Sequence, residues 1–216
     1  MNCIVTAGPT FEPLDEARRI TNFSTGRLGT ELSNFLVSKG HDVTLFVGQQ
    51  ATYCGERRAQ RVESFTTTAN LREQLQVLST QNIHAVFHSA AVSDFSFGNV
   101  WLRDARGELK PVKSKKISTR DGTLLAELLP TPKIIGQLRA WFPSAFLAGW
   151  KYEVDGNRAN VLAEAQRQLR DSLTDVCVAN GPAYGEGFGL ITAAGSCNHV
   201  PNHAELFEAL EKTLRT

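Results

Sequence analysis

The alternation of short apolar runs with longer amphipathic runs constrains the fold of this chain more than any other feature. Six short, strand-like runs are separated by helical patterns, namely Cys3–Thr6, Asp42–Val47, Ala85–His88, Ala145–Ala148, Asp175–Ala179 and Gly189–Thr192. Strands that alternate with helices form right-handed crossovers, and these build a mainly parallel sheet with helices on both faces. We therefore expect an α/β fold.

The helical patterns lie between these runs. The clearest is Arg27–Lys39, in which apolar residues repeat at helical spacing and Gly40 follows as a stop signal. Similar patterns cover Asn70–Leu78, Pro132–Phe142, Arg158–Leu173 and Ala204–Leu214. Because no repeat, low-complexity stretch or linker divides the chain, we expect one Rossmann-like domain over residues 1–216.

Composition excludes several classes of protein. The 216 residues are 42% hydrophobic, which is enough for one sizeable core, and no run is long enough to cross a membrane. Basic residues number 23 and acidic residues 22, so no net field favours nucleic acid. Cysteines 3, 54, 177 and 197 lack C-x-x-C spacing, and no signal peptide is evident. We expect a cytoplasmic protein without disulfides.

A glycine-rich segment links the first strand to the first long helix. Ligands of open α/β sheets bind outside the carboxyl ends of the strands, and the first strand ends at Gly8. A helix start offers free N–H groups and a positive dipole to an anion, and Gly26 and Gly29 allow close approach. Ser24 or Thr25 is expected to cap the helix. An ordinary capped helix is the alternative interpretation.

A dinucleotide oxidoreductase is the obvious rival. Its fingerprint places G-x-G-x-x-G directly after the first strand and an acidic residue at the end of the second. Here a long loop displaces the glycines, and the second strand ends in Val47–Gln50 without an acidic residue. This spacing disfavours hydride transfer.

Residues 93–122 interrupt the alternation. The segment is polar, contains four lysines, and favours a functional flap over a surface hairpin. Lys113, Lys115 and Lys116 are a candidate clamp for a polyphosphate, with a solvated basic loop as the alternative. Asp94 follows the apolar run Ala85–Val92 and is expected near the edge of the sheet.

The histidines give no metal site. His84 and His88 can share one face of a strand, but a third ligand is missing. Cys197, His199 and His203 are closely spaced without a regular helical pattern. We predict no metal bound by a protein cage.

Taken in order, these segments resemble the phosphopantothenoylcysteine synthetase family of coenzyme A biosynthesis. The matching segments are Ile4–Asp15, Ile20–Gly29, His88–Phe95, Lys113–Lys116 and Val178–Asn180. The resemblance implies a ligase that joins 4′-phosphopantothenate to cysteine. A nucleoside triphosphate (CTP in most bacteria, ATP in eukaryotes) would convert the substrate carboxylate to an acyl-nucleotide with loss of pyrophosphate, and the cysteine amine would then attack it.

The resemblance also implies roles for individual residues. Asn22 would stabilise the acyl intermediate, and Lys113 would neutralise the triphosphate. The nucleotide would be held by Ala90, Asp94, Pro132, Lys133, Ile134, Ile135 and the aromatic face of Trp150. Mg²⁺ would be held largely by phosphate oxygens. Family members are dimers, and the flavin-dependent decarboxylase of bifunctional relatives has no counterpart in this chain, so we expect a homodimer without flavin.

Several positions depart from the bacterial CTP-using pattern. Gly149–Val154 reads Gly-Trp-Lys-Tyr-Glu-Val where such relatives often read Gly-Phe-Ala-Ala-Glu-Thr, and Gly181 replaces an aspartate. CTP and ATP both remain open as the co-substrate. Two other functions also remain open, namely a non-catalytic nucleotide-binding module and an NAD(P)-dependent oxidoreductase.

Overall fold

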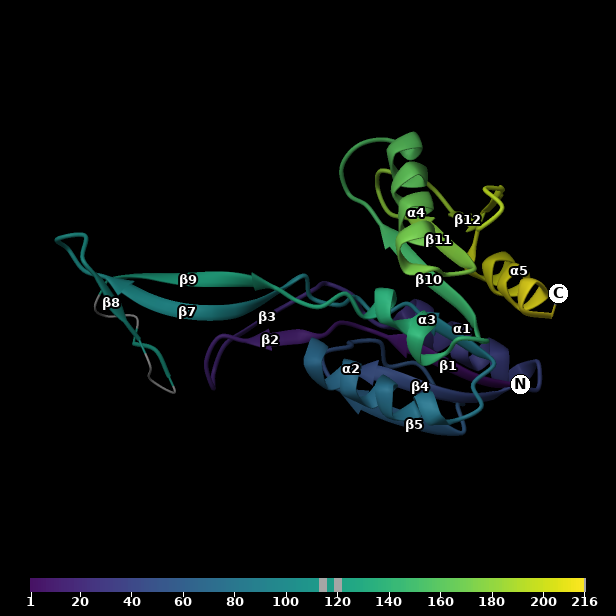
Figure 1. The fold of residues 1–216 in the computed structure, drawn as a ribbon, viewed down its shortest axis with the longest axis horizontal. Coiled ribbons are helices and arrows are strands. Elements are labelled where there is room, and N and C mark those ends of the chain that lie inside the picture. Colours follow the sequence, from purple (N-terminus) through teal and green to yellow (C-terminus); the bar gives the residue numbers. More distant parts are fainter. Residues whose placement is uncertain (113–115, 119–121, 216) are drawn as a thin grey trace.

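A computed structural model describes residues 1–112, 116–118 and 122–215. Its ribbon consists of an α/β body and a long arm that projects from one end of the body (Figure 1). Among the described residues, no helix has both the length and the apolar character that crossing a bilayer requires.

The body is built on an eight-stranded sheet in the order β13-β12-β11-β10-β6-β1-β4-β5. The strands are β1 Asn2–Ala7, β4 Asp42–Gly48, β5 Arg61–Phe65, β6 Ala85–His88, β10 Phe146–Tyr152, β11 Val176–Asn180, β12 Phe188–Thr192 and β13 Cys197–Val200. From β5 to β11 all neighbours pair in parallel, while β12 pairs antiparallel with both β11 and β13. This confirms the expected α/β, Rossmann-like fold.

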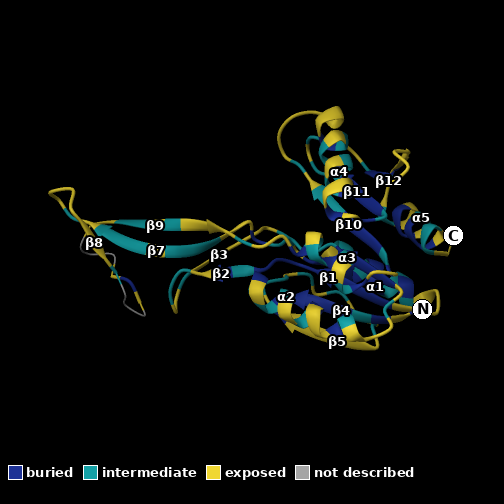
Figure 2. Ribbon diagram, viewed as in Figure 1, coloured by how far each residue is buried: buried dark blue, intermediate teal, exposed yellow. Residues whose placement is uncertain are grey.

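Helices cover both faces of the sheet. The helical elements are α1 Arg27–Ser38, α2 Thr68–Val77, η1 Leu78–Thr80, η2 Ile134–Gln137, α3 Leu138–Trp141, α4 Arg158–Ser172 and α5 His203–Arg215. Val5 and Phe87 pack with apolar residues of α1 and α5, whereas the alternate residues Ile4 and Val86 pack with α2, η2 and α3. Both faces are buried, as the dark blue strands of Figure 2 show, which explains the uninterrupted apolar runs in the sequence.

The arm is a second, antiparallel sheet in the order β8-β7-β9. It contains β7 Phe95–Arg103, β8 Leu109–Pro111 and β9 Thr123–Pro130, with an irregularity in register between Phe97 and Val100. A short hairpin of β2 Phe11–Pro13 and β3 Arg19–Thr21 lies along the base of the arm (Figure 1).

In the described part of residues 93–122, β7 and β8 form part of the arm, and the function of this segment as a flap stays a prediction. The structure corrects one expected helix. The helix expected over Pro132–Phe142 is a 3₁₀ turn over Ile134–Gln137 followed by the single turn of α3. Pro132 and the helix-weakening Gly136 account for the late and irregular start.

Candidate functional site

The order of the parallel strands reverses between β1 and β6, and this switch point brings several predicted residues together. Gly8 follows β1, and the loop 89–94 follows β6. The two segments continue to pair beyond the strands, because Ala91 donates its N–H to the Gly8 carbonyl at 3.0 Å and Thr10 donates to the Ala91 carbonyl at 3.2 Å. Ligands of doubly wound sheets bind at such a point.

Glycines allow the start of α1 to approach β1. Gly8 and Gly26 have φ angles of 82° and 81°, and a Cβ at Gly8 would lie 2.8 Å from the Ala51 Cβ. A Cβ at Gly29 would lie 2.6 Å from the Ser89 hydroxyl and 2.7 Å from the Ala7 Cβ. The glycine pattern therefore reflects close packing at this edge of the sheet.

The expected side-chain cap of α1 is wrong. The N-cap is Gly26, with no side-chain cap hydrogen bond, and the Thr25 hydroxyl accepts the Arg27 N–H at 3.3 Å instead. Gly26 fills this position because it has the left-handed conformation that a Ser or Thr cap does not favour. The half-buried Ser24 lies just outside the helix. An uncapped helix start at the switch point is suited to an anion.

Asn22 joins the glycine-rich segment to the loop after β6. Its carboxamide nitrogen lies 3.2 Å from the Ala91 carbonyl oxygen and 3.3 Å from that of Val92, and the residue is exposed. The next residue, Phe23, is fully exposed. An exposed phenyl ring beside a candidate catalytic amide was not singled out from the sequence, where it reads as an ordinary apolar residue.

Asp94 and Lys133 form an ion pair at the base of the arm. Both side chains are about two-thirds exposed, at 65% and 68%, so they remain accessible to a ligand. Thr131 reinforces the contact by donating its N–H to the Asp94 carbonyl at 2.9 Å. Pro132, which stands between Thr131 and Lys133 in the sequence, is exposed. The structure thus brings together two residues that the sequence places 39 positions apart.

The other predicted nucleotide contacts are less favourably placed. Ile134 is 1% exposed and packs in the core with α2, and Ile135 packs against the same cluster. Trp150 packs on the opposite face of the sheet, with the cluster that includes α1 and α5. Its indole N–H is buried without a hydrogen-bond partner. A sequence shows that a strand is apolar on both sides, but not which side chain faces which helix.

Lys113 and Lys115 lie outside the described residues, but the segment that follows them is anchored. The Asp15 carboxylate accepts the Ile117 N–H at 3.1 Å, and the Arg18 guanidinium donates to the Ile117 carbonyl at 2.6 Å. Arg18 also pairs with Asp15 at 2.6 Å and is the main cause of the strongly lowered pKa of that carboxyl. Ile117, next to Lys116, is therefore held to the β2–β3 hairpin that leads to Asn22.

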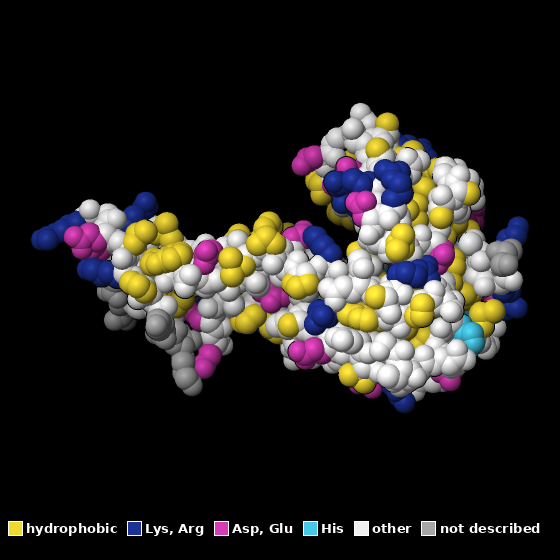
Figure 3. All heavy atoms as spheres, viewed as in Figure 1, with side chains coloured by type: hydrophobic (Ala, Val, Ile, Leu, Met, Phe, Trp, Pro, Cys, Tyr) yellow, Lys and Arg dark blue, Asp and Glu magenta, His cyan; other side chains and the backbone are white. Residues whose placement is uncertain are grey.

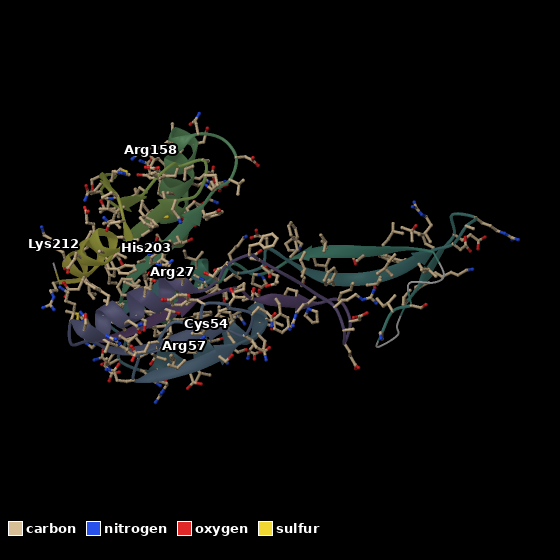
Figure 4. All side chains as sticks on the ribbon, turned by 180° about the vertical axis from the view of Figure 1, so that it is seen from behind. Arg27, Cys54, Arg57, Arg158, His203 and Lys212 are labelled. Atoms are coloured by element: carbon tan, nitrogen blue, oxygen red, sulfur yellow. The ribbon has the colours of Figure 1, made fainter. Side chains whose placement is uncertain are left out.

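A second polar cluster surrounds Glu31 in the first half of α1. The Glu31 carboxylate accepts hydrogen bonds from Arg27 at 2.7 Å and Tyr53 at 3.2 Å, and lies 3.0 Å from His203 Nδ1. Figure 4 shows Arg27 and His203 close together on this side. Sequence reasoning missed this cluster because its members are up to 172 residues apart.

The space around the switch point is open, and it lacks a cage of metal ligands. Figure 3 shows a hollow between the base of the arm and the lobe that carries α4. No group of three or more His, Cys, Asp or Glu side chains within the described ranges could hold a metal ion. A separate cavity of about 460 Å³ lies at the opposite edge of the sheet, near Leu173 and Thr174. Its position at the amino end of β11 sets it apart from the switch point.

Comparisons with known proteins agree with this geometry. The family model described as "DNA/pantothenate metabolism flavoprotein C-terminal domain" matches residues 1–213. The coenzyme A biosynthesis bifunctional protein CoaBC of Thermococcus kodakarensis is 30% identical over 181 residues, which cover 82% of this chain and 40% of that protein. CoaBC of Bacillus subtilis is 30% identical over 191 residues, covering 88% of this chain and 42% of that protein.

A solved structure is also similar along its whole length. The DNA/pantothenate metabolism flavoprotein from Streptococcus pneumoniae is 27% identical with a TM-score of 0.85, covering 100% of this chain and 98% of that chain. The chain thus matches a solved structure from end to end, whereas it spans about two fifths of the length of the two curated relatives.

Proposed function

The chain belongs to the family of DNA/pantothenate metabolism flavoprotein C-terminal domains, and we propose on this basis that it is a phosphopantothenate–cysteine ligase of coenzyme A biosynthesis. The observation that carries the proposal is the convergence of Asn22, the uncapped start of α1 and the Ala90–Asp94 loop at the switch point. The similarity to CoaBC proteins, which are named for coenzyme A biosynthesis, supports it.

The proposed reaction has two steps. A carboxylate oxygen of 4′-phosphopantothenate attacks the α-phosphorus of a nucleoside triphosphate, and pyrophosphate leaves. The nitrogen of cysteine then attacks the acyl carbon, loses a proton, and displaces the nucleoside monophosphate. The first step is necessary because a free carboxylate is inert to amines, whereas a phosphoryl ester gives the carbonyl a good leaving group.

The residues at the switch point suit these steps. Asn22 is a neutral donor that can stabilise charge on the acyl intermediate without competing for a proton. The exposed Asp94–Lys133 pair offers both a carboxylate and an ammonium group to the nucleotide. Lys113 would neutralise the triphosphate. Lys113 precedes Ile117 by four positions in the sequence, and Asp15 and Arg18 connect Ile117 to the hairpin leading to Asn22.

Mg²⁺ would accompany the triphosphate. The described residues offer no cluster of metal ligands, which suits an ion held by phosphate oxygens with at most one or two protein carboxylates. The ion would neutralise charge on the phosphates. We propose that flavin takes no part in the ligase reaction and that the protein works in the cytoplasm. All four cysteines lie in the described part of the chain and are free thiols, in keeping with a reducing compartment.

The deciding experiment supplies the pure protein with 4′-phosphopantothenate, cysteine and Mg²⁺, with CTP or ATP in parallel. Release of pyrophosphate together with the mass of phosphopantothenoylcysteine would establish the reaction, and the relative rates would give the preferred nucleotide. Nucleotide binding without pyrophosphate release would instead favour a non-catalytic module. NAD(P)H binding with hydride transfer would favour an oxidoreductase.

Substitutions test the two proposed catalytic residues. We expect Asn22→Ala and Lys113→Ala to fold normally and to lose turnover by two to three orders of magnitude, about 3–4 kcal/mol of transition-state stabilisation. Asn198→Ala and Lys212→Ala are matched controls, because both residues are exposed and lie on β13 and α5. Near-full turnover in a folded Asn22 or Lys113 variant would remove that residue from the site.

We also propose that the protein is a homodimer and that the arm forms the contact. Phe95, Leu109, Leu128 and Leu129 on the arm are 44–53% exposed, and Figure 3 shows hydrophobic side chains along its length. These side chains leave apolar surface of the three-stranded arm in water, so a second copy offers the burial that the arm lacks. Sedimentation should give a dimer that dissociates in Leu128→Ser, and a monomeric wild-type protein would refute the proposal.

A further inference from the structure

The side chain of Thr6, at the carboxyl end of β1, holds the loop that follows β6. Its hydroxyl oxygen accepts the Ala90 N–H at 3.1 Å and lies 2.9 Å from the His88 Nδ1. Its carbonyl oxygen accepts the Ser89 hydroxyl at 2.6 Å. One buried threonine therefore fixes three consecutive residues of a neighbouring strand and loop, 82 to 84 positions further along the chain.

The geometry assigns the protons in this cluster. Because the Thr6 oxygen already accepts the Ala90 N–H, its own hydrogen is best placed on the His88 Nδ1, which must then be unprotonated. The ring is consequently neutral, with its proton on Nε2. The reverse arrangement would leave a buried hydroxyl hydrogen without an acceptor among the contacts of this threonine, which is unfavourable. Burial also opposes a charged ring, because it lowers the pKa of His88 to about 4.

The loop that this cluster holds carries the candidate site. Ala91, next to Ala90, donates to the Gly8 carbonyl, and its own carbonyl accepts the Asn22 amide. Three residues further on, Asp94 pairs with Lys133. A displacement of Ala90 would therefore move the acceptors of Asn22 and the carboxylate of Asp94 together.

This inference rests on the proposed function and extends it to a residue that does not reach the ligand site itself. We propose that His88 is a positioning residue: its neutral ring fixes the Thr6 hydroxyl, which holds the Ala90–Asp94 loop in the geometry that binds the nucleoside triphosphate. Packing alone does not explain the residue, because a leucine would fill a similar volume without offering a hydrogen-bond acceptor.

The test compares substitutions that keep or remove the acceptor. In His88→Asn the amide oxygen can take the place of Nδ1, whereas His88→Leu removes the acceptor at similar volume. Thr6→Ser and Thr6→Val form the same contrast at the hydroxyl. His84→Leu is the control, since His84 immediately precedes the same strand, is exposed, and its ring accepts the Asn2 N–H away from the Thr6 cluster.

The readouts separate positioning from folding. The affinity for Mg·CTP and Mg·ATP is measured by calorimetry without the acid substrate, kcat and KM are measured with all substrates, and stability is measured by urea unfolding. We expect His88→Leu and Thr6→Val to raise the nucleotide Kd and KM roughly tenfold, as loss of one buried hydrogen bond permits, with kcat changed less. His88→Asn, Thr6→Ser and His84→Leu should stay within about threefold.

Nitrogen NMR of the histidines gives an independent readout that packing alone would not change. The wild-type His88 ring should be neutral with its proton on Nε2, and Thr6→Val should weaken that preference. Equal nucleotide affinities in the folded Asn and Leu variants, or a proton on Nδ1 in the wild type, would overturn the inference. A wild-type protein that binds neither nucleotide would overturn it as well. Absence of pyrophosphate release would refute the ligase alone, because the contrast in nucleotide Kd still decides the role of His88.

Discussion

The body and the arm are both sheets of one chain, but they are stabilised in different ways. In the body, neighbouring residues of β1 such as Ile4 and Val5 point to opposite faces, and both are fully buried. In the arm, β7 and β9 contain no buried residue, as their teal and yellow ribbons in Figure 2 show. Phe95 and Leu128 on these strands are almost half exposed. Most of the buried apolar surface therefore lies in the body, whereas the arm depends on its contacts at its base and on the surface that covers it.

The largest expected effect comes from the same substitution made in both regions. Phe87 is fully buried in the central sheet, so Phe87→Ala should cost about 3–5 kcal/mol of unfolding free energy. Phe95→Ala in the arm should cost less than about 1 kcal/mol while weakening self-association, because the ring is already half in water. Urea unfolding and sedimentation measure the two effects. Similar losses of stability in the two variants would contradict the division between body and arm.

Acid should weaken the body through His88. Burial lowers its pKa from 6.5 to about 4, so the folded protein excludes a proton that the unfolded chain binds below pH 6.5. Stability from this residue is therefore complete above pH 6.5 and is lost as the pH falls towards 4, by on the order of 3 kcal/mol. The cost of His88→Asn in urea unfolding should accordingly shrink between pH 7 and pH 4.5. A cost independent of pH would mean that His88 is not buried as a neutral ring.

The same contrast explains how much of the fold the sequence could predict. Five of the six predicted strands of the body are confirmed to within one residue at each end, and β10 continues to Tyr152, four residues beyond the predicted end. They were predictable because strands buried on both faces leave continuous apolar runs. The edge strand β5 was missed because Arg61 and Glu63 are exposed and break such a run. The strand β9 was missed because its leucines do not alternate strictly with polar residues.

Some positions in the candidate site could also be predicted from the sequence, and others could not. The position of Gly8, Ala90 and Asp94 at one edge of the sheet was predictable, because residues that follow parallel strands meet at one edge. The face on which Trp150 packs was not, since both sides of its strand are apolar. The contact of Thr6 with His88 and that of Asp15 with Ile117 join residues 82 and 102 positions apart. Neither contact leaves a periodic signal in the sequence.

Two glycine substitutions should show the same difference between body and arm with smaller changes in unfolding free energy. In the body, a Cβ at Gly29 would meet the Ala7 Cβ at 2.7 Å and the Thr6 carbonyl at 3.0 Å, both held by the central strand. Gly29→Ala should therefore cost about 1–3 kcal/mol despite the better helix propensity of alanine. In the arm, a Cβ at Gly98 would meet the ends of the Glu127 and Leu129 side chains, which can move away.

Gly98→Ala should change the unfolding free energy by less than about 0.5 kcal/mol. Urea midpoints of the two variants, measured side by side, check both expectations. A Gly98→Ala cost as large as that of Gly29→Ala would show that the arm is packed as tightly as the body.

The smallest effect is expected at the tip of the arm. The Asp104 carboxylate accepts the N–H groups of Arg106 and Glu108 and pairs with Lys110 at 2.9 Å. The hydrogen bond from Lys110 is the main cause of the lowered pKa of Asp104. The turn is therefore fully stabilised at a pH above the usual pKa of a carboxyl group, and it loosens as the pH falls through the lowered pKa.

Asp104→Ala should leave the urea midpoint unchanged, because the tip contributes no core. Hydrogen exchange should nevertheless quicken at β7 and β8 and stay the same in β1 and β6. Faster exchange in the central strands would show that the arm and the body unfold as one unit, and the contrast between them would then fail.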